Sequence, residues 1–196
     1  MPKVSQEYRD ARRAQILDAA RRCFLRNGFH ATSMQDLFAE AGLSSGAVYL
    51  YFASKEDVIL AIAEENMRDV AAVIRELATS RPQQSLGGAL SEVLGVIRKK
   101  HADDQLGGIA VLVWSEALRN PALAKRFGKS LQQMRNDLAE VVREHQARTK
   151  APGDASPDAV AALFMSIIPG YILQLSLFGP RVVAGVRDAV QSQWPA

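Results

Sequence analysis

The sequence predicts an all-α protein, in which an N-terminal three-helix unit with a helix-turn-helix precedes a larger helical body. Apolar residues recur at a helical spacing through most of the 196 residues, without the strict alternation that is typical of strands. Helix-starting and helix-stopping residues punctuate this pattern at intervals that indicate about nine helices. We expect the first unit to cover residues 1–54 and the body to cover residues 55–196.

The first helix is expected over residues 8–27. Ile16 and Phe24 fall on one stripe of such a helix, and Gly28 follows as a stop, because glycine readily adopts the conformation that ends helices. Cys23 lies on the same stripe, so we expect a buried, unreactive thiol there. As the chain's one cysteine, it also excludes an internal disulfide.

A short second helix is expected over residues 34–41. Thr32-Ser33 followed by Asp36 is a helix-start pattern, in which a side-chain oxygen accepts from a free amide of the first turn. Gly42 should end this helix in a tight turn, because it tolerates a positive φ. The sequence therefore predicts a helix, a tight turn and the start of another helix.

Two further serines mark the next helix starts. Ser44 or Ser45 should cap a third helix that continues to Leu50, and Ser54 should cap a long fourth helix over residues 55–78. A short helix after a glycine turn is the second half of a helix-turn-helix. Its small or hydroxyl-bearing outward residues would let it sit deep in a groove of DNA.

The body should contain five more helices. Leu86-Gly87-Gly88 is interpreted as a break, and Pro121 and Pro157 sit where a first helical turn tolerates proline. The expected helices cover residues 89–101, 105–119, 121–148, 157–178 and 181–193.

Charge and composition narrow the function classes. Basic residues outnumber acidic ones in residues 1–33, which suits contact with phosphates or equally the solvated face of a helix. The three histidines are scattered without a metal-binding spacing, and a phosphate-cradling glycine loop is not found. We therefore expect a protein that is not an enzyme and that needs no metal or cofactor.

The most specific signal is a local string of residues. Residues 28–34 (GFHATSM), 41–52 (AGLSSGAVYLYF) and 54–56 (SKE) closely resemble the N-terminal domain of the TetR family, the tetracycline-repressor-like regulators. The resemblance covers residues 9–60. Farther along, residues 114–121 (WSEALRNP) also look like a stretch seen in many members.

This resemblance implies a dimer that presents its two third helices to successive major grooves of double-stranded DNA. The residues that it implies for phosphate contacts are Thr32 or Ser33, Tyr49 or Tyr51, and Lys55. Those implied closest to the base edges are Ser44, Ser45, Gly46 and Ala47. The chain departs from the family pattern, which often has lysine, an aromatic residue and alanine, at Ser45, Leu50 and Phe38.

The body should hold both a ligand pocket and the dimer contact. Residues 159–180 carry no charge and would be long enough to cross a bilayer, but polar side chains dilute them and favour a helix packed against protein. By the resemblance, the dimer residues are Leu173, Leu177 and Trp194. Candidate pocket residues, each of which could equally be core, are Met67, Trp114, Leu131, Met134, Phe164, Met165, Tyr171 and Gln174.

Together these observations lead us to expect a cytoplasmic, ligand-responsive transcriptional regulator, and more specifically a repressor. It would bind a palindromic operator as a homodimer, without a membrane partner, and a small, largely apolar effector would release it. The alternative is a helical ligand-binding or membrane-associated protein that does not bind DNA specifically.

Overall fold

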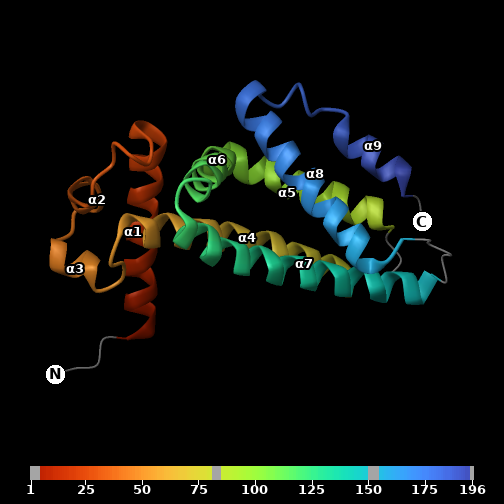
Figure 1. The fold of residues 1–196 in the computed structure, drawn as a ribbon, viewed down its shortest axis with the longest axis horizontal. Coiled ribbons are helices and arrows are strands. Elements are labelled where there is room, and N and C mark those ends of the chain that lie inside the picture. The colour runs from red at the N-terminus through yellow and green to blue at the C-terminus, as the bar shows by residue number, and fades with distance from the viewer. Residues whose placement is uncertain (1–4, 81–84, 150–154, 195–196) are drawn as a thin grey trace.

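The computed structural model describes residues 5–80, 85–149 and 155–194, and its regular structure is helical throughout, which confirms the predicted fold class (Figure 1). The described residues form nine helices: α1 (Gln6–Asn27), α2 (Met34–Ala41), α3 (Ser45–Tyr49), α4 (Lys55–Ser80), α5 (Leu86–Asp104), α6 (Leu106–Ala117), α7 (Pro121–Thr149), α8 (Pro157–Phe178) and α9 (Val186–Gln193).

The molecule has two parts, joined by one long helix. Helices α1, α2 and α3 form the N-terminal unit at one end, and α4 runs from this unit along α7 into the body, which comprises α4 to α9 (Figure 1). Within the body, α7 packs on α8 and α5 packs on α9. Because α4 contacts both α1 and the body helices, it is positioned to connect the two parts.

The hydrophobic core of the N-terminal unit extends into the body. Leu37 and Val48 of the unit share one buried cluster with Val58 of α4, Val113 of α6 and Phe127 of α7. A second cluster fills the rest of the body between α4, α5, α7, α8 and α9. The boundary expected after residue 54 falls at the start of α4, but apolar packing continues across it, so a division there stays a prediction.

Local capping chemistry sets the helix-turn-helix, as the sequence predicts. Ser33 begins α2 in a capping box: the Asp36 amide donates to Ser33 Oγ at 3.2 Å, and the Ser33 amide donates to Asp36 Oδ2 at 2.7 Å. Gly42 ends α2 with φ +65°, a left-handed conformation that most side chains disfavour. Of the two serines expected to begin α3, Ser44 is the cap, accepting from the Ala47 amide at 3.3 Å.

Two expected helix starts in the body are wrong, and α5 also ends at Asp104 instead of at residue 101. Helix α5 begins at Leu86, so Leu86-Gly87-Gly88 is its first turn and not a break. A Cβ at Gly87 would lie only 2.6 Å from the carbonyl oxygen of Val190, which means that small residues are needed for close packing of α9 on α5. The last helix begins at Val186, after a run of turns, instead of at residue 181.

Candidate nucleic-acid interface and ligand cavity

Helix α3 presents a short, uncharged surface to solvent. Ser45, Gly46 and Tyr49 are exposed, while Val48 is fully buried in the cluster that also contains residues of α1 and α4. The amino end of α3 therefore offers a hydroxyl and bare backbone, and nothing lies within 4 Å of a Cβ built on Gly46. Such a surface can enter a major groove without obstruction by long side chains.

Tyr49 combines packing with exposure. Its ring meets the Phe38 ring edge-on, with centroids 5.3 Å apart, yet the residue remains 52% exposed. The expected packing of the Tyr49 ring is thus found, and Phe38 is the residue of α2 that supports it. Tyr51 is half-buried against the core of the N-terminal unit, and Leu50 is exposed. Contact of either tyrosine hydroxyl with phosphate stays a prediction.

Thr32 and Lys55 make hydrogen bonds inside the protein. Thr32 is buried, and its hydroxyl donates to the carbonyl oxygen of Gly28 at 2.7 Å. The Lys55 ammonium donates to the carbonyl oxygens of Phe29, His30 and Thr32 at 2.9, 3.4 and 3.1 Å. An ammonium has three N–H donors, so Lys55 has none left for a phosphate in this conformation. Both residues hold the loop between α1 and α2 in this structure, and their contacts with phosphate stay predictions.

Most of the arginines on α1 are neutralised by acidic partners. Arg22 and Arg26 both pair with Glu40 of α2, at 2.7 and 3.1 Å. Arg9 and Arg12, near the start of α1, pair with no acidic side chain in the described part of the chain. The start of α1 therefore carries two guanidinium groups without an acidic partner among the described residues, on a turn that also carries Glu7 and Asp10.

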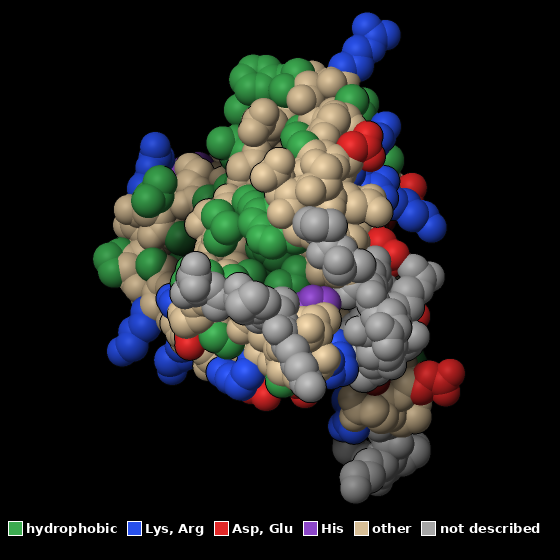
Figure 2. All heavy atoms as spheres, turned by 90° about the vertical axis from the view of Figure 1, so that its right-hand side faces the viewer, with side chains coloured by type: hydrophobic (Ala, Val, Ile, Leu, Met, Phe, Trp, Pro, Cys, Tyr) green, Lys and Arg blue, Asp and Glu red, His purple; other side chains and the backbone are tan. Residues whose placement is uncertain are grey.

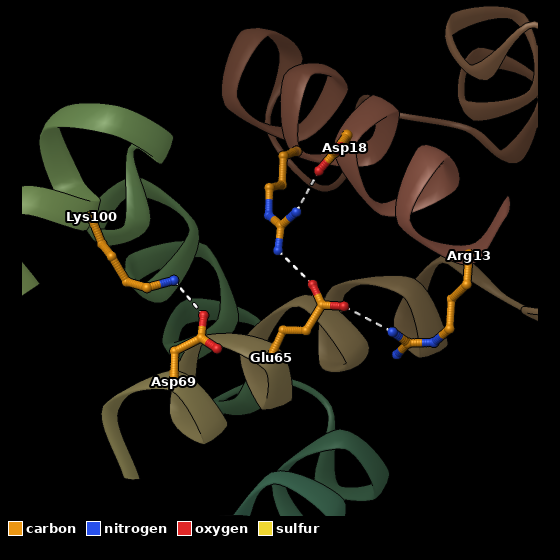
Figure 3. Close-up of polar contacts among 6 residues, drawn as sticks. Arg13, Asp18, Glu65, Asp69 and Lys100 are labelled. Carbon is orange, nitrogen blue, oxygen red and sulfur yellow. Dashed lines mark hydrogen bonds and ion pairs between the residues drawn. The ribbon is translucent and has the colours of Figure 1, made fainter. Parts of the chain in front are cut away.

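Ion pairs tie α4 to both parts of the molecule (Figure 3). Glu65 of α4 accepts from Arg13 and from Arg21 of α1, at 2.8 and 2.7 Å. One turn farther along α4, Asp69 pairs with Lys100 of α5. Successive turns of α4 thus form ion pairs with the N-terminal unit and with the body. A shift of α4 within the body would therefore move the partners of Glu65 on α1.

Helix α6 makes a second link to the N-terminal unit. The buried carboxylate of Glu116 lies 3.2 Å from His30 Nε2, which belongs to the loop between α1 and α2. At the other end of α6, Gly108 lies against α1, where an added Cβ would be 2.7 Å from the Leu25 side chain. Helix α6 therefore touches α1 and the loop that Lys55 also holds.

An apolar cavity of about 480 Å³ lies in the body between α4, α6, α7 and α8. This volume is in the range of about 300–1,000 Å³ that is usual for small-molecule sites. Of the predicted pocket residues, those that line it are Met67, Trp114, Leu131, Met134 and Met165. The apolar walls continue through residues that sequence reasoning missed, including Leu106, Phe127 and Pro169.

Three predicted pocket residues lie elsewhere. Phe164 is buried on another face of α8, where its ring meets Trp194 edge-on at 5.7 Å. Tyr171 is buried in the core without lining the cavity, and Gln174 is exposed. Asn66 was missed: it is the wall residue that carries a side-chain amide. The sequence signal that could have found Asn66 is its position directly before Met67, a predicted pocket residue on the same helix.

Helix α8 also carries an exposed apolar stripe. Leu163, Leu173, Leu177 and Phe178 are 45%, 40%, 60% and 66% exposed, at the spacing of one helix face. Figure 2 looks onto the body from the end opposite the N-terminal unit and shows hydrophobic side chains in the middle of that face, with charged side chains toward its edges. The two predicted dimer leucines are thus accessible, whereas Trp194 is partly covered by its packing on Phe164.

The same helix is long and apolar enough to cross a membrane by length and composition alone, the one such helix in the described ranges. Part of it is buried within the body, because Val160, Ile168 and Ile172 contribute to the core. The length and apolar composition of α8 therefore also fit a core helix that has one face exposed to solvent.

A helix-turn-helix on an exposed end, connected by α4 to an apolar cavity, defines a DNA-binding regulator with a ligand-binding body. The comparison with protein families agrees. Residues 16–62 match the bacterial regulatory proteins of the tetR family, and residues 93–193 match the C-terminal region of BetI-type transcriptional repressors. The chain belongs to the TetR family of transcriptional regulators.

Individual relatives span almost the whole chain. The uncharacterized HTH-type transcriptional regulator YfiR of Bacillus subtilis is 29% identical over 197 residues, which is 97% of this chain and 92% of YfiR. The structure of Salmonella enterica GusR is similar, with a TM-score of 0.77, 24% identity and 97% of each chain covered. Bacillus subtilis FadR in complex with stearoyl-CoA has a TM-score of 0.69 and 21% identity, over 91% of this chain and 95% of FadR. These structural likenesses bear on the fold.

Proposed function

We propose that this regulator is a repressor that binds a palindromic operator as a homodimer and leaves it when a small, largely apolar molecule occupies the body cavity. The observation that carries the proposal is the shared use of α4 and α6. Met67 and Trp114 line the cavity, while the same two helices hold the N-terminal unit through Glu65 and Glu116. An occupant of the cavity would therefore press on the helices that orient α3.

Release requires a difference in ligand affinity between two conformations. A molecule that fits the cavity only when α4 or α6 has shifted stabilises that arrangement by the difference in its binding free energy. Glu65 would carry the shift to α1 through Arg13 and Arg21. The distance between the two α3 helices of a dimer would then no longer match two grooves about 34–36 Å apart.

Homodimer formation is supported by the apolar stripe of α8. A single α3 reaches only a few base pairs, which is too little for specificity in a genome, so a second copy is needed. Leu173 and Leu177 provide an uncharged surface that a two-fold axis could use twice. A bacterial regulator that binds a DNA operator acts in the cytoplasm, where the chromosome lies, and needs no membrane partner.

The test begins with selection of bound sequences from random DNA duplexes, followed by a screen for molecules that release the selected operator. We expect an inverted repeat whose binding weakens steeply with salt. Spin labels on the two N-terminal units of the dimer should report a changed separation when a releasing ligand is added. Binding that does not discriminate between duplexes would overturn the proposal and favour a helical ligand-binding protein.

A further inference from the structure

Among the residues that the structure describes, those that line the body cavity carry no ionisable side chain. They are apolar apart from the Asn66 amide and the Trp114 indole N–H, although the cavity adjoins helices with many charged residues. A ligand that is wholly enclosed there would therefore meet carbon and sulfur on most of its surface. Removal of that apolar surface from water favours binding.

The acidic residues next to the wall are occupied elsewhere. Glu65, adjacent to Asn66, pairs with two arginines of α1, and Glu64 accepts a hydrogen bond from Ser130. Glu116, two residues after Trp114, has its carboxylate 3.2 Å from His30 Nε2 and does not line the cavity. A cationic ligand would thus find no free carboxylate in the wall, and an anionic ligand would find no cation there. A buried, unpaired charge is strongly unfavourable.

The Asn66 amide is available to a ligand. It forms no hydrogen bond with any other described residue, and its polar atoms are not sealed off from contact. An amide can donate and accept at once, so it matches a hydroxyl or a carbonyl group. Three flexible methionines, Met67, Met134 and Met165, complete the walls and can adapt to a chain or a ring.

We infer that the ligand of this cavity is a neutral amphiphile: an aliphatic chain or ring with one hydroxyl or carbonyl group, which hydrogen-bonds to Asn66. This inference rests on the proposed function, because it names the chemical class of the effector that the body would sense. It selects neutral molecules over fatty-acid anions and over cationic amphiphiles of the same chain length.

The test uses three ten-carbon probes on the full-length protein: 1-decanol, decanoate and decyltrimethylammonium, measured by calorimetry at pH 8. We expect 1-decanol to bind at least tenfold more tightly than either ion. Equal or tighter binding of an ion, or no binding of 1-decanol, would overturn the inference.

A variant separates the role of Asn66 from general apolar burial. Asn66→Leu keeps the branching at Cγ but replaces the amide with a larger apolar group, and it should weaken 1-decanol binding three- to tenfold, while Asn136→Leu, on the exposed face of α7, should leave it unchanged. Unchanged binding in Asn66→Leu would overturn the hydrogen bond. If the variant loses its folded far-UV signal, Asn66→Val replaces it, because valine can neither donate nor accept a hydrogen bond, and it should weaken 1-decanol binding by a similar factor.

The selected operator distinguishes this inference from the proposed function. If decanoate binds most tightly and releases the operator, the regulator senses ligands as proposed and the neutral class is wrong. If 1-decanol binds through Asn66 and leaves the operator bound, the ligand class holds and release by cavity occupation fails.

Discussion

Two cations of the N-terminal unit have different roles. Arg9 lies on the exposed start of α1, where its guanidinium contacts only Gln6 among the described residues. Lys55 uses all its N–H donors on carbonyl oxygens and lies 4.5 Å from the centre of the Phe29 ring. Arg9 is therefore free to contact phosphate, whereas Lys55 holds the loop that precedes α2.

Alanine substitution should separate these roles. Arg9→Ala should weaken binding about equally on operator and random duplexes. The slope of log K against log salt concentration should become shallower by about one, and the melting temperature should not change. Lys55→Ala should lower the free energy of unfolding by about 1–2 kcal/mol, because carbonyl oxygens lose their donor, and should weaken operator binding as a consequence. For each variant, anisotropy titrations measure the affinity for DNA and thermal melts measure the stability. If Arg9→Ala lost affinity for the operator and kept its affinity for random duplexes, a phosphate contact of Arg9 would be contradicted.

Tyr49→Phe tests the exposed hydroxyl of α3. The ring would still pack on Phe38, so the melting temperature should not change. Loss of a hydrogen bond to a charged phosphate should weaken operator binding by about 1.5–3 kcal/mol. Phe38→Ala is the complementary variant, since it removes the supporting ring and leaves the hydroxyl. Affinity of Tyr49→Phe equal to that of the unaltered protein at moderate salt would count against the phosphate contact.

At the level of elements, α4 is held at its start by Asp57. This carboxylate accepts from Ser54 Oγ at 2.9 Å and pairs with Arg126 of α7. Burial alone raises the pKa of Asp57, but the hydrogen bonds from Arg126 and Ser54 outweigh it and bring the pKa below its ordinary value of 3.8. Asp57 thereby connects the first turn of α4 with α7.

This lowered pKa predicts a pH dependence with a definite sign. A carboxyl whose pKa is lower in the folded state stabilises the fold above the unfolded-state pKa and loses that effect as pH falls through the folded value. Urea unfolding at pH 7 should show Asp57→Asn less stable than the unaltered protein, and the difference should shrink below about pH 4. Asp10→Asn, on the exposed start of α1, is the control. A difference that does not decrease as the pH falls below about 4 would show that the ion pair is not its cause.

For the whole molecule, the proposed dimer depends on the exposed stripe of α8. Leu173→Glu with Leu177→Glu would bury unpaired carboxylates in any interface formed there, at a cost too large for association. We expect a folded monomer in sedimentation and a sharply reduced operator affinity. Leu118→Glu is the control, because Leu118 is 89% exposed at the end of α6 and away from this stripe. A double variant that stays dimeric would place the interface elsewhere.

The sequence by itself determined the helix-turn-helix and most helix boundaries. Ser33 with Asp36, Gly42 and Ser44 are readable because capping and turn chemistry act between residues at most four positions apart. Helix α8 begins and ends where expected for the same reason, with Ser156 as its cap. The family resemblance of residues 28–56 adds the expected role of α3, and the family comparison supports it.

Only the tertiary structure decided where side chains of similar type end up. Met134 lines the cavity while Phe164 meets Trp194, although both were equally suitable apolar candidates. Lys55 was expected at a phosphate but reaches three carbonyl oxygens more than twenty residues away in sequence. Gly87 lies in the first turn of α5, where the absence of a side chain lets α9 pack closely. These outcomes depend on partners distant along the chain, whereas composition and periodicity report only which face of a helix is apolar.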